Sequence, residues 1–492
     1  MLLISMKRLK RVRVDHPIVQ KKIDRSLKLS VNEGAAASVS TAFGTSYFSA
    51  FALLLNASAA QVGLLHAIVN LLPSLMQMTT ANLIERYSRK MVVLKMIFWR
   101  IVLWGFIIGI GVLFYYGVPF MSWAFILLAG LAYGFTAVAD PLWFSWMGSL
   151  VPEAIRGKYF SKRNRVIGVF NVVTLIIGAV ILDYSKSLGV VYGDVVGLTL
   201  LGFGILFSIA AIARIVSWFM LKAQYEPKIK VRKKDYFGFR NFWDNLWTMP
   251  FGRFCILRFM LNCSVGIASP FFVVYMLEYL DFSYLWYIGI SVSPVVFQIM
   301  FLPLFGKISD SFGNVSLMRI SMWGIGGTAL AWTLVDFVPE GYLKVYLLIV
   351  PAIFAGFGWA GHNLAVNNYV YDALNSRTRS FGIGYMNLFA GLGTFVGAMI
   401  GTLFVWLDVS FFNPIVFIFA ISAFCRILLA FCGERLLVEV RNVKKFYARF
   451  LVDEFGPAHT LIKEIHNIEH IVRRNKVEHY IEEGDSKRYV SS

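Results

Sequence analysis

The fold is indicated by stretches such as residues 91–115, which read MVVLKMIFWRIVLWGFIIGIGVLFY. A helix needs about 20 apolar residues to cross a hydrocarbon core of about 30 Å, and this stretch reaches that length. Stretches of the same kind recur along the chain, at residues 38–56, 60–84, 118–149, 165–186, 195–221, 251–278, 284–306, 315–336, 342–371, 380–405 and 410–433. The sequence therefore predicts an all-α integral membrane protein with about 12 transmembrane helices.

The composition agrees with a lipid environment. Hydrophobic residues make up 58% of the 492 residues and charged residues only 15%, with a mean hydropathy of +0.65. A soluble domain has about 25% charged residues, so this chain has too few to cover a water-facing surface. The net charge of +19 fits the basic bias of cytoplasmic loops, and we expect membrane lipids rather than nucleic acid as partners.

The cysteines and the first residues predict no metal site, cofactor, disulfide or cleaved leader. The start, MLLISMKRLKRVRV, lacks the apolar core of a signal peptide. Buried free thiols are expected, because none of the cysteines has a metal-ligand spacing or lies in an outer loop. All four fall in predicted spans: Cys255, Cys263, Cys425 and Cys432.

Basic residues alternate from loop to loop. The loops after the second, fourth and sixth spans are rich in Lys and Arg, whereas the loops on the other side contain only Lys186 and Lys344. Cytoplasmic loops carry the excess of Lys and Arg in membrane proteins. We therefore predict a multi-pass protein of the cell membrane with both termini in the cytoplasm.

The spans divide the chain into five segments. A basic N-terminal segment, 1–37, precedes a six-helix bundle, 38–221. A linker, 222–250, mixes basic and aromatic residues as surface-lying amphipathic helices do, and a second six-helix bundle, 251–433, follows it. Residues 434–492 form a charged cytoplasmic tail.

The two bundles resemble each other at a nearly constant offset. Gly168 corresponds to Gly391 and Asn164 to Asn387, each 223 residues further on. Further matches lie at equivalent places in the loops: Gly178 with Gly401, Arg156 with Arg379, and Glu85 with Asp310. Many transporters are built from such repeats, with the substrate site between them near the middle of the membrane.

Two loop motifs give the chain a family resemblance. Residues 81–90 read ANLIERYSRK and residues 306–314 read GKISDSFGN. Together they resemble the motif G-x-x-x-D-x-x-G-R-[RK] that the major facilitator superfamily carries after its second helix. The first copy keeps the acid and the basic pair, and the second keeps the glycines and the acid. Residues 150–160, LVPEAIRGKYF, look like the loop entering the fifth helix of that family.

The resemblance implies two six-helix bundles that rock around a central cavity. It also implies that the motif acid contacts the N-terminal end of a helix in the neighbouring bundle, where the helix dipole attracts a carboxylate. The alternative is that these residues are ordinary solvated loop charges. The gate candidates are Glu85, Arg89, Lys90, Asp310, Arg156 and Arg379.

Polar residues within the spans are the candidates for the transport site, because a polar group in the bilayer core must be paired or face a cavity. Asp140 lies about nine residues, or ~13 Å, from the inner end of its span, and we predict it as a proton or cation site. His362 and Asn363 lie at a similar depth, and Asn363 is the repeat equivalent of Asp140. The resemblance implies that these two spans line the cavity. The alternatives are local hydrogen bonding of Asp140 beside Pro141 and simple packing of His362.

Other polar residues are either cavity-lining or engaged between helices. Arg100 lies near the middle of its span, where it either contacts an anionic substrate or is paired. Arg214 and Arg426 are expected to extend toward the inner interface. The remaining cavity candidates are Asn70, Asn171, Asn262, Gln298, Asn367 and Asn387.

These observations predict a monomeric secondary active transporter that moves a small solute by alternating access. A proton or ion gradient is the expected energy source, since no Walker-type nucleotide motif is present. An exporter of lipophilic compounds such as drugs or lipids stays open as an alternative. A membrane-embedded enzyme would need clustered His, Asp or Glu near one interface, and a transporter-derived sensor would need a larger tail, so no catalytic residue is expected.

Overall fold

The computed structural model describes residues 17–80, 83, 87–152, 155–227, 239–375, 379–406 and 413–444, and within these ranges its regular secondary structure is helical, without strands. The helices of the first half are α1 (Pro17–Phe43), η1 (Thr45–Tyr47), α2 (Phe48–Leu54), α3 (Ala59–Met78), α5 (Arg89–Tyr115), α6 (Met121–Leu150), α7 (Arg156–Tyr192) and α8 (Val195–Lys222). A short helix, α9 (Phe239–Asp244), lies in the linker. The second half contains α10 (Pro250–Ala268), α11 (Phe271–Val274), η4 (Tyr275–Tyr279), α12 (Tyr284–Thr333), η5 (Val335–Phe337), α13 (Glu340–Ala373), α14 (Arg379–Trp406), α15 (Pro414–Cys432) and η6 (Gly433–Leu436).

Ten of the described helical segments are long and apolar enough to cross a membrane. One of them, α12, consists of two helices that meet at Gly313, where φ is 84° and ψ is 170°. The first predicted span is formed by α1 and α2, which η1 joins. The described residues therefore account for the predicted twelve passes, and the all-α membrane fold is confirmed.

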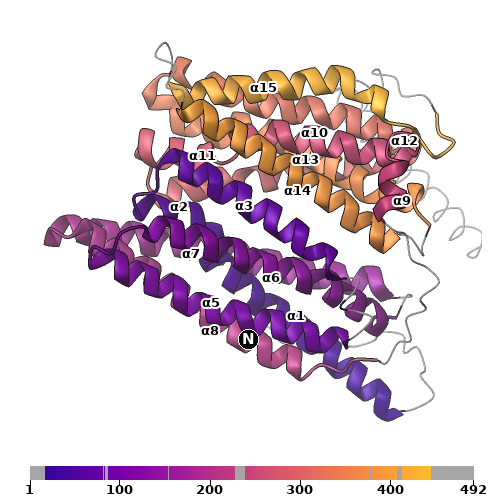
Figure 1. Ribbon diagram of the computed structural model, residues 1–492, viewed down its shortest axis with the longest axis horizontal. Coiled ribbons are helices and arrows are strands. Elements are labelled where there is room, and N and C mark those ends of the chain that lie inside the picture. The colour runs from indigo at the N-terminus through magenta and orange to yellow at the C-terminus, as the bar shows by residue number, and fades with distance from the viewer. Residues whose placement is uncertain are drawn as a thin grey trace, which may run out of the picture.

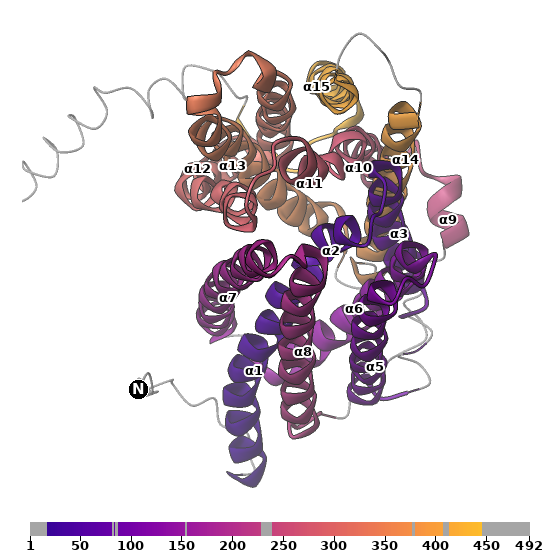
Figure 2. The ribbon, with the colours of Figure 1, turned by 90° about the vertical axis from the view of Figure 1, so that its left-hand side faces the viewer.

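The helices form two sets, α1 to α8 and α10 to α15, which lie against each other (Figure 1). Along the boundary α3 runs beside α14, and α7 contacts α12 (Figure 2). The α3–α14 contact is close, because a Cβ at Gly391 would come within 1.9 Å of Ser74 Oγ. At the same boundary the Asn387 side chain donates a hydrogen bond of 3.1 Å to Gln77 Oε1.

The two ends of this assembly have different cores. We call the end at which α5 and α10 begin the basic end, and the end at which α12 begins the opposite end. At the opposite end one hydrophobic cluster joins both halves, with Phe51 and Phe125 of the first half and Phe271 and Phe419 of the second. At the basic end each half has its own cluster, which includes Trp146 in the first half and Phe254 in the second. Among the described residues, the cluster of buried residues that both halves share lies at the opposite end, and at the basic end Met78 of the first half packs against the second-half cluster.

The first helix begins earlier than predicted. Residues 1–37 are predicted to lie outside the bundle, but α1 starts at Pro17 and buries Ser26, Ser30 and Glu33 within the first half. The physical reason is an ion pair, since Glu33 Oε2 lies 3.3 Å from Arg163 Nη2 of α7. This pairing compensates a charge that the sequence alone gives no reason to bury.

Candidate functional site

Asp140 lies ten residues before Leu150, where α6 ends, and has an open carboxylate. The residue is exposed, and no residue in the described part of the chain forms a hydrogen bond or ion pair with it. Phe144, one turn further along α6, is 64% exposed, so neighbouring helices leave this face uncovered. Ionisable residues within spans face a bundle interior or a water-filled cavity. Asp140 and Phe144 thus mark an exposed face of α6.

Two arginines of the first half lie inside the same helix set as this carboxylate. Arg100 of α5 and Arg214 of α8 are both buried, and both interact electrostatically with Asp140. The Nε atoms of both arginines are buried without a hydrogen-bond partner among the described residues. Arg100 therefore points into the bundle, where it balances Asp140 rather than extending to the membrane surface.

A second carboxylate, Glu33, is fully engaged nearby. Besides the ion pair with Arg163, its Oε1 accepts a hydrogen bond of 2.9 Å from Ser217 Oγ. Arg214 Nη1 lies 3.5 Å from the same Ser217 hydroxyl, and the Arg163 guanidinium stacks over Trp143 at 4.2 Å. Glu33 is therefore a paired residue, in contrast to the open Asp140.

The second half presents an equivalent open face on α13. Asn363 and Asn367 are both exposed, and residues four apart lie on one face of a helix. They are the repeat equivalents of Asp140 and Phe144, each 223 residues further on. His362, the adjacent residue, is 1% exposed and its Nε2 lies 2.8 Å from Arg258 Nη1 of α10. The structure thus brings His362 together with an arginine that the sequence did not single out.

The other asparagine and glutamine candidates differ in their hydrogen-bond partners. Asn70 and Asn262 donate hydrogen bonds of 2.8 Å to carbonyls of their own helices, at His66 and Arg258. Asn387 bonds to Gln77 across the boundary between the halves. Asn171 and Gln298 are half-buried, and no described residue makes a hydrogen bond to their side chains.

Arg426 differs from its predicted orientation. It is 3% exposed and donates to the carbonyls of Ile325 and Val265 at 3.3 Å each. Arg214, also expected to extend toward the interface, is 7% exposed and lies inside the first half. Internal partners hold both side chains, because carbonyl and hydroxyl acceptors lie within reach in neighbouring helices.

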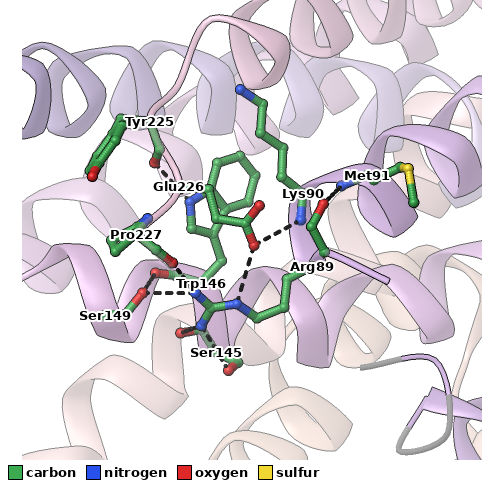
Figure 3. A network of polar contacts seen from close by, with 10 residues as sticks. Arg89, Lys90, Met91, Ser145, Trp146, Ser149, Tyr225, Glu226 and Pro227 are labelled. Carbon is green, nitrogen blue, oxygen red and sulfur yellow. Dashed lines mark hydrogen bonds and ion pairs between the residues drawn. The ribbon is translucent and has the colours of Figure 1, made fainter. Parts of the chain in front are cut away.

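At the basic end of the first half, Arg89 is the centre of a polar network (Figure 3). Its Nη1 donates to the Ser145 carbonyl at 2.9 Å, its Nη2 donates to Ser149 Oγ at 3.3 Å, and its Nε lies 3.4 Å from Glu226 Oε1. The same Glu226 oxygen accepts the Lys90 backbone N–H at 3.3 Å. Residues that follow α8 are thereby fixed to the beginning of α5.

The second half has a corresponding network with other residues. Asn314 Nδ2 donates to Asp372 Oδ2 at 2.6 Å, and Arg441 Nε lies 3.2 Å from the same oxygen. Glu439 Oε2 accepts the backbone N–H of Val315 at 3.0 Å. The close approach of Glu439 to Gly313 leaves no room for a Cβ, which would lie 2.2 Å from Oε2. Residues that follow α15 are thereby fixed to the second part of α12.

Some of the predicted gate residues lie in the described part of the chain and others lie outside it. Glu85 lies outside the described residues, and so does the side chain of Arg156. Asp310 is exposed and makes no hydrogen bond or ion pair with any described residue. Arg379 stacks over the Tyr371 ring at 4.4 Å and donates to the Leu374 carbonyl at 3.3 Å.

A carboxylate contact of the kind expected of a gate acid occurs at the opposite end. Asp183 of α7 accepts the backbone N–H groups of Tyr284 at 2.7 Å and Leu285 at 2.9 Å, at the beginning of α12 in the other half. Lys186 pairs with Asp281 at 3.2 Å beside it. The sequence alone does not indicate this cap, because Asp183 matches no loop motif and its partner lies about one hundred residues away.

No group of three or more His, Cys, Asp or Glu residues in the described ranges could hold a metal ion. The four cysteines are free and do not form disulfides. The polar groups of the site are thus a set of arginines, asparagines, a histidine and one open carboxylate.

Comparisons with known proteins agree on the type of fold. The family model described as Major Facilitator Superfamily matches residues 34–398 and, in a second placement, 254–450. A search of curated proteins found no match. Among solved structures, the nucleoside transporter NupG is 15% identical, with 84% of this chain and 98% of that chain covered and a TM-score of 0.56.

Two further solved structures show the same fold. A bacterial homologue of the iron transporter ferroportin, in an inward-facing state, is 15% identical, with 85% of this chain and 98% of that chain covered and a TM-score of 0.60. The xylose transporter XylE from E. coli, in a partially occluded inward open conformation, is 16% identical, with 85% and 100% covered and a TM-score of 0.54.

Proposed function

Because the chain belongs to the major facilitator superfamily, a family of membrane transporters, we propose that it is a secondary active transporter that moves a small solute by alternating access. The basic end is the cytoplasmic end in this proposal, since the loops there carry the excess of Lys and Arg. Among the described residues, the cluster of buried residues that both halves share lies at the opposite end. This arrangement supports a state in which the cavity is open toward the cytoplasm.

The observation that carries the proposal is the open carboxylate of Asp140. Every other ionisable group of the first-half cluster either is buried or has a partner, whereas Asp140 is exposed on an uncovered helix face. A carboxylate inside a membrane protein is costly to keep charged, and it gains most from binding a proton or cation. Asp140 is therefore the proposed coupling site, with the positive charges of Arg100 and Arg214 in the same half of the protein.

Uptake into proteoliposomes by the Asp140→Asn variant tests the coupling role. We expect the variant to lose gradient-driven, uphill uptake while it retains exchange of solute down its own gradient, because the amide cannot release a proton. Asp24→Asn is the matched control, since Asp24 is exposed and, among the described residues, its carboxylate bonds only to Gln20 within α1. Uphill uptake that persists in Asp140→Asn at the wild-type level would refute the coupling role.

A further inference from the structure

Arg258 of α10 carries a charge that the second half does not balance. It lies eight residues from Pro250, where α10 begins, or about 12 Å into the membrane at 1.5 Å per residue. A charged side chain at that depth is unfavourable by several kcal/mol unless it is paired or faces water. Among the described residues, no Asp or Glu lies within ion-pair distance of Arg258.

The hydrogen bonds of Arg258 leave most of its donors unused. Nη1 donates to His362 Nε2 at 2.8 Å, and Nε is buried without a partner among the described residues. Nη2 has no hydrogen bond with the described residues, and it is not one of the buried atoms that lack one. The Nη2 atom of the guanidinium therefore keeps some accessible surface.

His362 does not neutralise this charge. Guanidinium nitrogens only donate hydrogen bonds, so the Nε2 atom that faces Nη1 must be the acceptor. The ring is then neutral with its proton on Nδ1, which is itself buried without a partner among the described residues. His362 orients the arginine and leaves its full positive charge in place.

Other arginines inside the protein have a carboxylate or carbonyl groups that compensate their positive charge. Arg163 is paired with Glu33, and Arg426 donates to two backbone carbonyls. Arg100 and Arg214 share the negative charge of Asp140. Arg258 has none of these compensations in the described part of the chain, and its contact on α13 is His362, the residue before Asn363.

We propose that Arg258, oriented by His362, binds an anionic group of the transported solute, either a carboxylate or a phosphate. Both groups accept two parallel hydrogen bonds from a guanidinium, and the open side of Arg258 offers them. The inference rests on the proposed transport function and adds the class of solute. A proton bound at Asp140 and a monovalent anion bound at Arg258 would together add no net charge to the protein.

Melting temperatures of the full-length protein in lipid nanodiscs, at constant ionic strength, test this binding. The probes are inorganic phosphate, succinate and benzoate, with succinamide and benzamide as uncharged counterparts. We expect at least one anion to raise the melting temperature of the wild type above the effect of its uncharged counterpart or of added sodium chloride. Charge-assisted hydrogen bonds contribute enough that Arg258→Gln should weaken this binding roughly 10- to 100-fold.

Two further variants separate binding from folding. Arg258→Lys keeps the charge and should retain measurable anion binding, which keeps the test valid if Arg258→Gln is poorly folded. Arg435→Gln is the matched control, since Arg435 is exposed near the end of the last span, and it should bind as the wild type does. Anions that stabilise no better than their amides, or equally well in Arg258→Gln, would overturn the assignment. That result leaves the transport function standing, because the latter is judged separately by uphill uptake.

Discussion

The two ends of the molecule differ in which half supplies the carboxylate that caps a helix. At the basic end each cap comes from the same half, with Glu226 on the start of α5 and Glu439 on the second part of α12. At the opposite end the cap crosses the boundary, since Asp183 of the first half bonds to the start of α12 in the second. The caps at the basic end therefore stabilise each half by itself, whereas the cap at the opposite end holds the halves together.

The two networks at the basic end join equivalent positions of the repeat through residues of different charge. Arg89 reaches Ser149 in the first half, and Asn314 reaches Asp372 in the second. Ser149 and Asp372 are repeat equivalents, 223 residues apart. The second loop motif lacks the basic pair, and Arg441 from the segment after α15 supplies a guanidinium in its place. The tail thus completes a site that the loop alone leaves without a cation.

Removing Arg89 should have the largest effect on stability. Its side chain is 8% exposed and holds Glu226, Ser145 and Ser149 in one network. Breaking a buried pair leaves the remaining charge unpaired, at a cost of about 3–5 kcal/mol. Thermal unfolding of Arg89→Met in nanodiscs should show a markedly lower melting temperature than wild type. A melting temperature like that of Arg435→Met would contradict the role of this network.

Replacing Arg441 should destabilise the protein less. Its side chain is 34% exposed and that of Asp372 is 20% exposed, so solvent screens the pair and the expected loss is about 1 kcal/mol. Truncation after residue 436 should lower the melting temperature more than Arg441→Met does, because it removes both the guanidinium and the Glu439 cap on α12. Equal melting temperatures of the two variants would contradict a stabilising role of that cap.

The fold could be predicted from the sequence, and the partners of the buried charges could not. Apolar length fixed the passes, and the repeat located Asp140 and Asn363 on equivalent faces. Glu33 pairs with a residue 130 positions away, and Asp183 with a helix start about one hundred positions away. Glu226, Glu439 and Arg441 lie in segments that composition classes only as linker and tail. Such contacts depend on how helices pack, and no local pattern in the chain encodes them.

The Asp183 cap should have a smaller effect on stability than on conformation. A carboxylate at a helix N-terminus contributes about 0.3–1 kcal/mol, and Asn can replace only part of it. Asp183→Asn should therefore melt nearly as the wild type does, while a cysteine placed at exposed Ser187 in that background reacts faster with a thiol reagent added from outside. Equal reaction rates in both backgrounds would show that the cap does not close this end.

The Lys186–Asp281 pair should matter least. Its side chains are 44% and 83% exposed, and exposed ion pairs contribute about 0–1 kcal/mol. Lys186→Met should leave the melting temperature and the Ser187 labelling rate close to wild type. A loss as large as that of Asp183→Asn would mean that the ion pair, and not the helix cap, closes the opposite end.

Distances measured by double electron–electron resonance in nanodiscs test most directly whether one end of the protein closes as the other opens. In a background without the four native cysteines, one spin-label pair at Ser161 and Ser311 spans the halves at the basic end. A second pair at Ser187 and Tyr342 spans them at the opposite end, and all four sites are exposed. We predict that Asp183→Asn shortens the distances of the first pair and lengthens those of the second. Distances that stay unchanged at both ends, or lengthen at both together, would contradict rocking of two halves about a central cavity.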